Sequence, residues 1–142
     1  MKPVASAGVR STGPNYRHEI RTGGHDLVAD EPTSAGGKDA GPAPYDFVLA
    51  GLGACTAITL RMYAEKKGWD LGELRVDLAL FKDREGNASI ERVLHSSASL
   101  DDAQWERLLE IAGKTPVTRT LQAGATITTR RGDATETNRT SG

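Results

Sequence analysis

The sequence predicts an α+β fold, and two patterns carry this prediction. Apolar and polar residues alternate in short segments at 15–22 and 74–82, which is typical of strands that bury one face. The run from Phe47 to Leu60 contains no charged residue and follows a proline, which favours a buried helix. The predicted order is two strands, a helix, two strands, two helices and a last strand, which places the chain in the α+β class.

A hairpin is predicted in the N-terminal part of the chain. Residues 15–22 form its first strand, Gly23-Gly24 its turn, and residues 25–31 the returning strand. Three prolines and three glycines then fall between residues 32 and 44 and predict a loop. This loop lacks the Gly-Lys-Ser/Thr ending of a phosphate-binding loop, so we do not expect it to bind phosphate.

The central helix is expected to run from Pro44 to about Lys67. Proline suits the first turn of a helix, and Asp46 places a negative charge near the positive helix end. Gly68 is placed to end the helix. The small residues around Cys55 would let another helix approach closely.

The remaining elements are predicted from alternation, caps and prolines. Either Asp101 or Asp102 caps the second helix. In chain order the predicted elements are strands at 74–82 and 88–100 joined by a turn near 85–87, a helix at 102–112, a short helix from Pro116 to about Leu121, and a strand at 125–129.

The chain length of 142 residues is that of one domain. We expect this domain to span residues 15–130. A flexible N-terminal segment at 1–14 and a disordered tail at 131–142 would flank it, because both ends are polar and lack periodicity.

Composition argues against several partners. The 18 basic and 19 acidic residues leave a formal net charge of -1, so we expect neither a nucleic-acid nor an anionic-membrane partner. The uncharged run from Phe47 to Leu60 is shorter than the roughly 20 residues that span a bilayer. The N-terminus lacks the apolar core of a secretory signal. We therefore expect a cytoplasmic protein.

Cys55 is the only cysteine, so no disulfide can form within the chain, which suits a reducing cytosol. A lone thiol in an apolar helix is most often an inert core residue. The three histidines are widely spaced along the chain, so we expect no metal site.

Several motifs in one order change the interpretation of this thiol. They are HDLVADEP at 25–32, the glycine pair at 36–37, GPAPYD at 41–46, LGACTAITLRMYAEKKGW at 52–69 and TPVTRTL at 115–121. Together they resemble the OsmC/Ohr family, named for osmotically inducible protein C and the organic hydroperoxide resistance protein. The resemblance covers about residues 15–130, and the segment around Cys55 is its most specific part.

The resemblance implies a curved antiparallel sheet around a central helix and an interwoven homodimer. It also implies that Cys55 is the peroxidatic thiol of a hydroperoxide reductase. In such enzymes an arginine from an early strand, oriented by a carboxylate, stabilises the thiolate. Arg21 is the predicted arginine, with Arg17 as an open alternative. Asp46 is the predicted carboxylate. It lies next to Tyr45, and Tyr45 stands where those enzymes carry glutamate.

The chain departs from the family at the resolving position. Thr115 stands where the family has its second cysteine, and Thr118 stands where it commonly has histidine. Threonine cannot form a disulfide, so an external thiol would have to reduce oxidised Cys55. No cofactor is expected.

Two hypotheses about function therefore stay open. The first is a one-cysteine peroxidase that reduces organic hydroperoxides through Cys55 with an external thiol. The second is a non-catalytic OsmC-like dimer that binds a small apolar ligand, or a protein in which Cys55 senses redox state. Retention of Cys55 favours the first, whereas Thr115 and Tyr45 favour the second.

Overall fold

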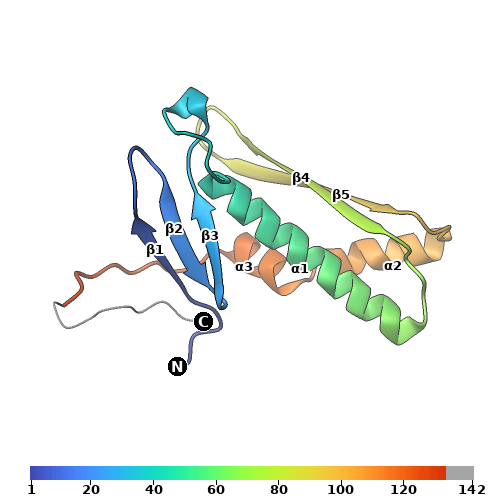
Figure 1. The fold of residues 1–142 in the computed structure, drawn as a ribbon. Coiled ribbons are helices and arrows are strands. Elements are labelled where there is room, and N and C mark those ends of the chain that lie inside the picture. The colour runs from blue at the N-terminus through green and yellow to red at the C-terminus, as the bar shows by residue number, and fades with distance from the viewer. Residues whose placement is uncertain (134–142) are drawn as a thin grey trace. The chain divides into compact units, whose positions relative to one another are not determined.

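The computed structural model describes residues 1–133, and it confirms the α+β class (Figure 1). The chain divides into two compact units where the sequence predicted one domain at 15–130. The first unit comprises Met1–Phe47 with the stretch that begins at Ile127, and the second comprises Val48–Thr126. The strands accordingly form two separate antiparallel sheets.

The first unit is built on a three-stranded antiparallel sheet. Its strands are β1 (Ala7–Ser11), β2 (His18–Thr22) and β3 (His25–Ala29), in that spatial order. The predicted hairpin is confirmed: Gly23 and Gly24 form its turn with φ of 57° and 77°, a backbone conformation that glycine adopts without strain.

Strand β1 corrects the expectation that residues 1–14 are flexible. All five of its residues, Ala7–Ser11, pair with β2. The sequence hid this strand because Val9 is its only large apolar side chain, so the alternation is too weak to stand out. The backbone ladder to β2, not apolar burial, holds the strand in place. The tail predicted at 131–142 lies mostly outside the described residues.

A buried carboxylate organises the loop after β3. Asp30 is 2% exposed, and its carboxylate accepts backbone N–H groups from Glu31, Lys38 and Ala40 at 2.7, 3.2 and 3.0 Å. The hydrogen bond from Ala40, supported by the other two donors, holds the pKa of Asp30 below its usual value. A side chain at Gly37 would collide with the backbone of Glu31. The aspartate and the glycine pair of the motifs therefore shape this loop, which contains the short 3-10 helix η1 (Thr33–Ala35).

Helix α1 (Pro44–Lys67) begins and ends as predicted, and Gly68 stops it with φ of 70°. By length and composition α1 would suffice to cross a membrane, with a mean hydropathy of 1.5 in its most apolar stretch, and 28% of that stretch is buried. Buried core helices of soluble proteins meet the same criteria. The helix is longer than the uncharged run from Phe47 to Leu60 on which the prediction rested. That the protein has no membrane partner therefore stays a prediction.

The second unit adds a hairpin and two helices to α1. The hairpin is formed by β4 (Leu74–Lys82) and β5 (Ala88–Ser96). Asp101 is the N-cap residue of helix α2 (Asp102–Ala112) and forms a reciprocal capping box with Gln104, and α3 (Pro116–Ala123) follows α2. Both strands and both helices were predicted, although β5 ends at Ser96 and not at residue 100.

The predicted strand at 125–129 is not present. These residues have no regular secondary structure in the described chain. A strand needs a partner edge for its backbone groups, and alternation of side chains alone does not supply one.

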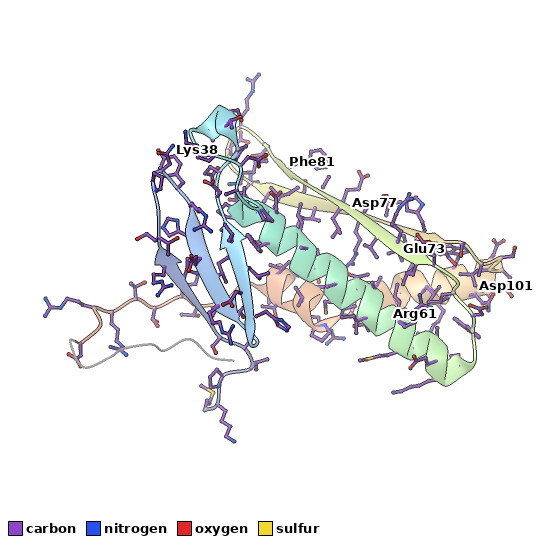
Figure 2. All side chains as sticks on the ribbon, in the orientation of Figure 1. Lys38, Arg61, Glu73, Asp77, Phe81 and Asp101 are labelled. Atoms are coloured by element: carbon purple, nitrogen blue, oxygen red, sulfur yellow. The ribbon has the colours of Figure 1, made fainter. Side chains whose placement is uncertain are left out.

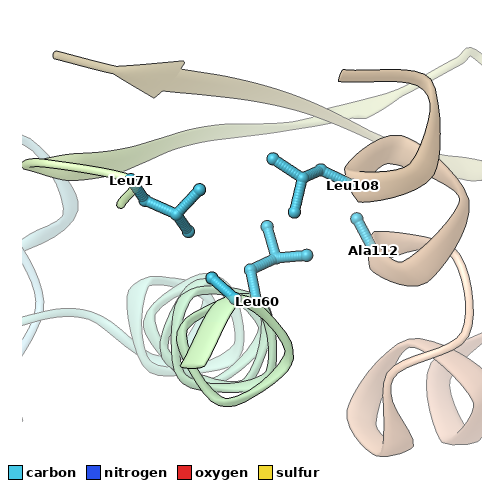
Figure 3. Packing of buried hydrophobic residues seen from close by; sticks show 5 residues of the cluster. Leu60, Leu71, Leu108 and Ala112 are labelled. Carbon is cyan, nitrogen blue, oxygen red and sulfur yellow. The ribbon is translucent and has the colours of Figure 1, made fainter. Parts of the chain in front are cut away.

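The core of the second unit lies where α1, α2 and the β4–β5 hairpin meet. Three leucines are completely buried and converge on one another (Figure 3): Leu60 of α1, Leu108 of α2, and Leu71 between α1 and β4. Partly buried side chains from the hairpin, including Leu74 and Leu94, pack against this cluster. The packing fixes which face of α1 and of β5 points inward, and it thereby positions the polar groups described next.

Candidate active site

Helix α1 places Cys55 at a half-buried position, where it is a free thiol. The next residue, Thr56, is completely buried, and its hydroxyl donates to the Leu52 carbonyl one turn earlier at 2.7 Å. A buried threonine hydroxyl has lone pairs left after such a bond. The hydroxyl of Thr56, the residue after Cys55, can therefore accept a hydrogen bond from a further donor, and it does so.

That donor is Arg92 of β5. Its guanidinium Nη1 donates to the Thr56 hydroxyl at 2.9 Å and to the Thr118 hydroxyl at 2.8 Å. Its Nη2 donates to the Ala112 carbonyl at 2.8 Å. Three elements, α1, α3 and the end of α2, thus hold one half-buried guanidinium in a fixed orientation.

The threonines at the predicted resolving position belong to the same cluster. Thr115 is 1% exposed and is the N-cap residue of α3. Its hydroxyl lies 2.6 Å from the hydroxyl of Thr118, which also lies 3.3 Å from the Ala112 carbonyl. At these two positions the chain has hydroxyls that extend the hydrogen-bond network of Arg92.

The electrostatics of the cluster follow from these partners. In the described part of the chain the groups that bond to Arg92 are two hydroxyls and a carbonyl, all neutral. Ala112 is the last residue of α2, where the helix dipole favours a cation. Partial burial lowers the pKa of Arg92, and the negative charge of a Cys55 thiolate opposes that shift. Arginine nevertheless stays charged at any working pH.

Sequence reasoning missed Arg92, although the strand carried a signal. Within β5, Arg92 lies on the same strand face as Ile90 and Leu94, so the strand pattern places a charged residue on the apolar face. A charge on that face must find partners inside the protein, because leaving it unpaired costs several kcal/mol or more.

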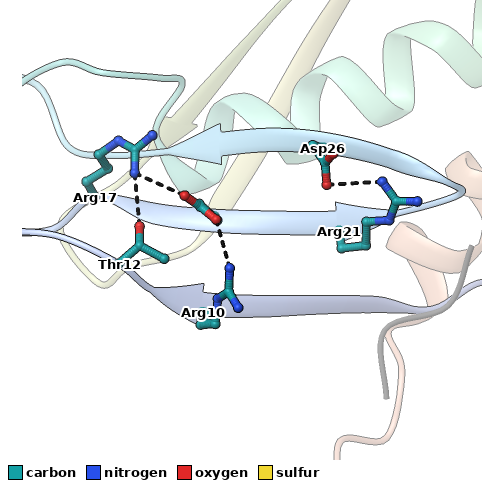
Figure 4. A network of polar contacts seen from close by, with 6 residues as sticks. Arg10, Thr12, Arg17, Arg21 and Asp26 are labelled. Atoms are coloured by element: carbon teal, nitrogen blue, oxygen red, sulfur yellow. Dashed lines mark hydrogen bonds and ion pairs between the residues drawn. The ribbon is translucent and has the colours of Figure 1, made fainter. Parts of the chain in front are cut away.

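The arginines that the sequence put forward lie in the first unit. Arg21 pairs with Asp26 at 3.1 Å, and Arg17 lies 3.5 Å from Glu19 (Figure 4). Arg10 also binds Glu19, at 2.9 Å. Each of these arginines thus has a carboxylate partner across or along the sheet.

Asp46 has a structural role at the start of α1. Its carboxylate accepts the backbone N–H of Ala43 at 2.9 Å, which satisfies one of the donors at the helix end. Arg21 and Asp46 belong to the first unit and Cys55 to the second. The catalytic roles predicted for these two side chains stay predictions.

A groove lies along α1 and reaches the start of β4. It has a volume of about 420 Å³, and Arg61, labelled in Figure 2, lies in its lining. The lining is otherwise mainly apolar and consists of Ala57, Ile58, Arg61, Met62, Glu65 and Leu74. Among the residues that the structure describes, no group of three or more His, Cys, Asp or Glu side chains is placed to hold a metal ion.

Solved structures with the same fold come from several bacteria. An OsmC-like protein from Mycoplasma pneumoniae superposes with a TM-score of 0.67 and 17% identity, over 86% of this chain and 89% of the other. An organic hydroperoxide resistance protein OsmC from Legionella pneumophila superposes with a TM-score of 0.62 and 20% identity, over 84% of this chain and 90% of the other. The organic hydroperoxide resistance protein OhrB of Bacillus subtilis superposes with a TM-score of 0.60 and 22% identity, over 84% of this chain and 90% of the other.

No curated protein matches the chain in sequence. The sequence profile of the family described as OsmC-like protein, however, matches residues 36–130, which is more than half of the chain and includes Cys55, Arg92 and the three buried threonines of the cluster. The chain belongs to the OsmC-like protein family.

Proposed function

We propose that this protein is a one-cysteine thiol peroxidase that reduces organic hydroperoxides through Cys55. The observation that carries the proposal is that the guanidinium of Arg92 binds the hydroxyl of Thr56, the residue that follows the free, half-buried Cys55, and that its partners among the described residues are all neutral. A nearby cation favours a thiolate, which is the nucleophilic form of cysteine. The organic hydroperoxide resistance proteins among its structural relatives supply the substrate class.

The reaction has two stages. In the first, the Cys55 thiolate attacks the terminal oxygen of the hydroperoxide, a sulfur–oxygen bond forms, and the oxygen–oxygen bond breaks. The alkoxide leaves and takes up a proton, which yields an alcohol and a cysteine sulfenic acid. The thiol sulfur is oxidised by two electrons, and the peroxide is reduced by two.

The second stage needs an external thiol because Thr115 cannot act as a resolving residue. A small thiol attacks the sulfenic sulfur, water leaves, and a mixed disulfide forms. A second molecule of the thiol then releases Cys55 and leaves as the disulfide of the small thiol. No cofactor takes part in this cycle.

The test is consumption of cumene hydroperoxide by the purified protein, with and without a small dithiol. We expect turnover only when the thiol is supplied, and no consumption above background for Cys55→Ser. If Cys55→Ser consumes peroxide as fast as the wild type, Cys55 is not the reactive group.

A second variant tests the part assigned to residue 115. In Thr115→Cys we expect peroxide to produce an intrachain disulfide through the Cys55 sulfenic acid, seen in intact mass as the loss of two hydrogens. Without added thiol the wild type should instead gain two oxygens as it passes to sulfinic acid. A Thr115→Cys protein that gains oxygens and forms no disulfide would show that residue 115 does not occupy the resolving position.

We further propose that the protein is a cytoplasmic homodimer. Helix α1 exposes large apolar side chains, including Ile58 at 54% and Met62 at 58%, and a second copy of the chain would remove them from water. Light scattering should report a dimer at micromolar concentration. A stable folded monomer would contradict this proposal without affecting the assignment of Cys55.

The apolar groove on α1 favours a second candidate function, the binding of a small apolar ligand. Cys55 does not belong to its lining, so binding there would survive Cys55→Ser. A fluorescent fatty-acid probe that binds equally to the wild type and to Cys55→Ser, together with absent peroxide turnover, would favour this alternative.

A further inference from the structure

We infer that the α1 helices of two copies of the chain pack antiparallel across the groove along α1, and that Arg61 of each copy pairs with Glu65 of the partner subunit. The inference rests on the proposed homodimer, because it assigns the surface, the helix orientation and the charged residues through which that dimer forms. It does not depend on peroxide turnover by Cys55.

The first argument concerns the shape of this face of α1. Ile58 and Met62 lie about one turn apart, are 54% and 58% exposed, and line a groove of about 420 Å³ that Leu74 of β4 also lines. The face thus offers two projecting apolar side chains and a hollow beside them. A two-fold dimer joins one surface patch to the same patch of the partner, so this face is able to fill its own groove.

The second argument concerns two charges that have no partner in the chain. Arg61 and Glu65 line the same groove about one helical turn apart, and both are exposed. Within the described part of the chain neither side chain forms an ion pair, although their spacing allows one. A carboxylate that follows the cation along a helix is the less favourable order, which is consistent with this lack of pairing. Both charges are therefore available to a partner.

The guanidinium of Arg61 is nevertheless held in place. Its Nη2 donates to the Gly72 carbonyl at 2.9 Å, in the turn before β4. Gly72 has φ of 59°, and a side chain there would collide with Ser97, so the turn fixes the orientation of this carbonyl. A carbonyl satisfies one N–H group but does not neutralise the charge. Arg61 therefore presents a positioned positive charge in the lining of the groove.

The order of the two charges selects the antiparallel arrangement. In a parallel two-fold pair each residue lies level with its own copy, so Arg61 would face Arg61 of the partner subunit. In an antiparallel pair centred on the groove, Arg61 lies toward Glu65 of the partner subunit, and this contact occurs twice in the dimer. Like charges across an interface are unfavourable, whereas complementary charges fix its register.

A small apolar ligand is the other occupant that the groove would admit. Such a ligand would cover Ile58, Met62 and Leu74, but it would leave Arg61 and Glu65 without partners of opposite charge. A second copy of the same face covers the apolar side chains and also supplies both charges. The charge pattern thus favours the second copy.

The experiment reverses the charges at the two positions. The variants are Arg61→Glu, Glu65→Arg and the double variant Arg61→Glu/Glu65→Arg, and Arg75→Glu is the control. Arg75 is an exposed arginine of β4 that pairs with Asp77 at 3.3 Å. Because Arg61 and Glu65 are exposed, we expect every variant to fold, and circular dichroism checks this.

Each single variant places like charges opposite each other twice in the dimer. We expect the dissociation constant of the dimer, measured by analytical ultracentrifugation, to rise at least about tenfold in Arg61→Glu and in Glu65→Arg. The double variant restores opposite charges and should return to within about threefold of the wild type. Arg75→Glu should leave the constant unchanged.

A mixture of the two single variants gives a second readout. At the two positions Arg61→Glu carries only negative charges and Glu65→Arg only positive ones, so pairing between the two variants is favoured. Native mass spectrometry should therefore find heterodimers well above the share of about half that random pairing gives. If a reversal does not fold, Arg61→Gln and Glu65→Gln carry the test, with a smaller rise of the dissociation constant expected from each.

The failures are distinguishable. A wild-type dimer whose dissociation constant does not change in the folded variants, or a mixture that pairs at random, would overturn the inference and leave the proposed homodimer intact. A monomeric wild type would contradict the homodimer and this inference together. Peroxide turnover by Cys55 would stand in both cases.

Discussion

The arginines of the first sheet and Arg92 of the second unit have opposite kinds of partner. Arg10, Arg17 and Arg21 of the first unit lie on a sheet surface, and each is paired with a carboxylate of the same sheet. Arg92 of the second unit is half-buried and is held by neutral oxygens alone among the described residues. A surface ion pair neutralises its own charge and is screened by water. A guanidinium held by hydroxyls keeps its full charge for whatever anion comes near, and the proposed function makes a Cys55 thiolate that anion.

Residue type alone does not identify a catalytic cation, because arginines differ in the partners that they already have. The register of the first sheet places Arg10 opposite Glu19 and Arg21 opposite Asp26, so these charges are satisfied locally. An arginine that already binds a carboxylate gives less stabilisation to a thiolate. What distinguishes Arg92 is its set of partners.

The largest effect on stability is expected from the cluster around Arg92. Thr118→Val leaves a charged donor without one of its acceptors and breaks the bond to Thr115, so unfolding free energy should fall by about 1–3 kcal/mol. Thr118→Ser keeps the hydroxyl and should lose less. Urea denaturation of both variants measures the difference, and equal losses would mean that the hydroxyl does not matter.

The next effect appears in acid and concerns Asp30 of the first unit. Because its pKa is lowered in the folded protein, its carboxylate stabilises the fold above the ordinary aspartate value of 3.8, and this contribution is lost as pH falls through the lower folded value. Wild type should therefore be more stable than Asp30→Asn at neutral pH, and the gap should close in acid. Thermal melts between pH 7 and pH 2 measure this difference in stability between the wild type and Asp30→Asn. A difference that does not change with pH would contradict the role of Asp30.

The smallest effect is expected from the surface ion pairs of the first sheet. Glu19→Gln removes the partner of Arg10 and of Arg17, yet exposed pairs contribute only about 0–1 kcal/mol. We expect a change below about 1 kcal/mol, and added salt should shrink it further. A loss as large as that of Thr118→Val would remove the distinction between the two units.

Much of the fold was predictable because local signals were strong. The proline that opens α1, the glycine after it and the capping aspartate of α2 fixed both helices to within a residue. Strand β1 and the missing strand at 125–129 were not predictable, since strand formation depends on a partner edge that local sequence does not specify.

The candidate site was predictable in part. Cys55, Thr115 and Thr118 followed from the family motifs, and the structure places the two threonines in one cluster with Arg92. Arg92 itself depends on strand register and on contacts between segments 26 and 36 residues apart in sequence, which periodicity alone does not reveal. Its charge on an apolar strand face was the one local signal.

The most direct test of the account is the rate constant for sulfenic acid formation at Cys55, trapped with dimedone after brief exposure to cumene hydroperoxide. Arg92→Met and Arg21→Met remove the same charge from the two units, and Arg75→Met serves as the control. We predict that Arg92→Met slows the reaction by at least about tenfold, equivalent to about 1.4 kcal/mol, and that Arg21→Met slows it less. A large loss in Arg21→Met with no loss in Arg92→Met would contradict the account.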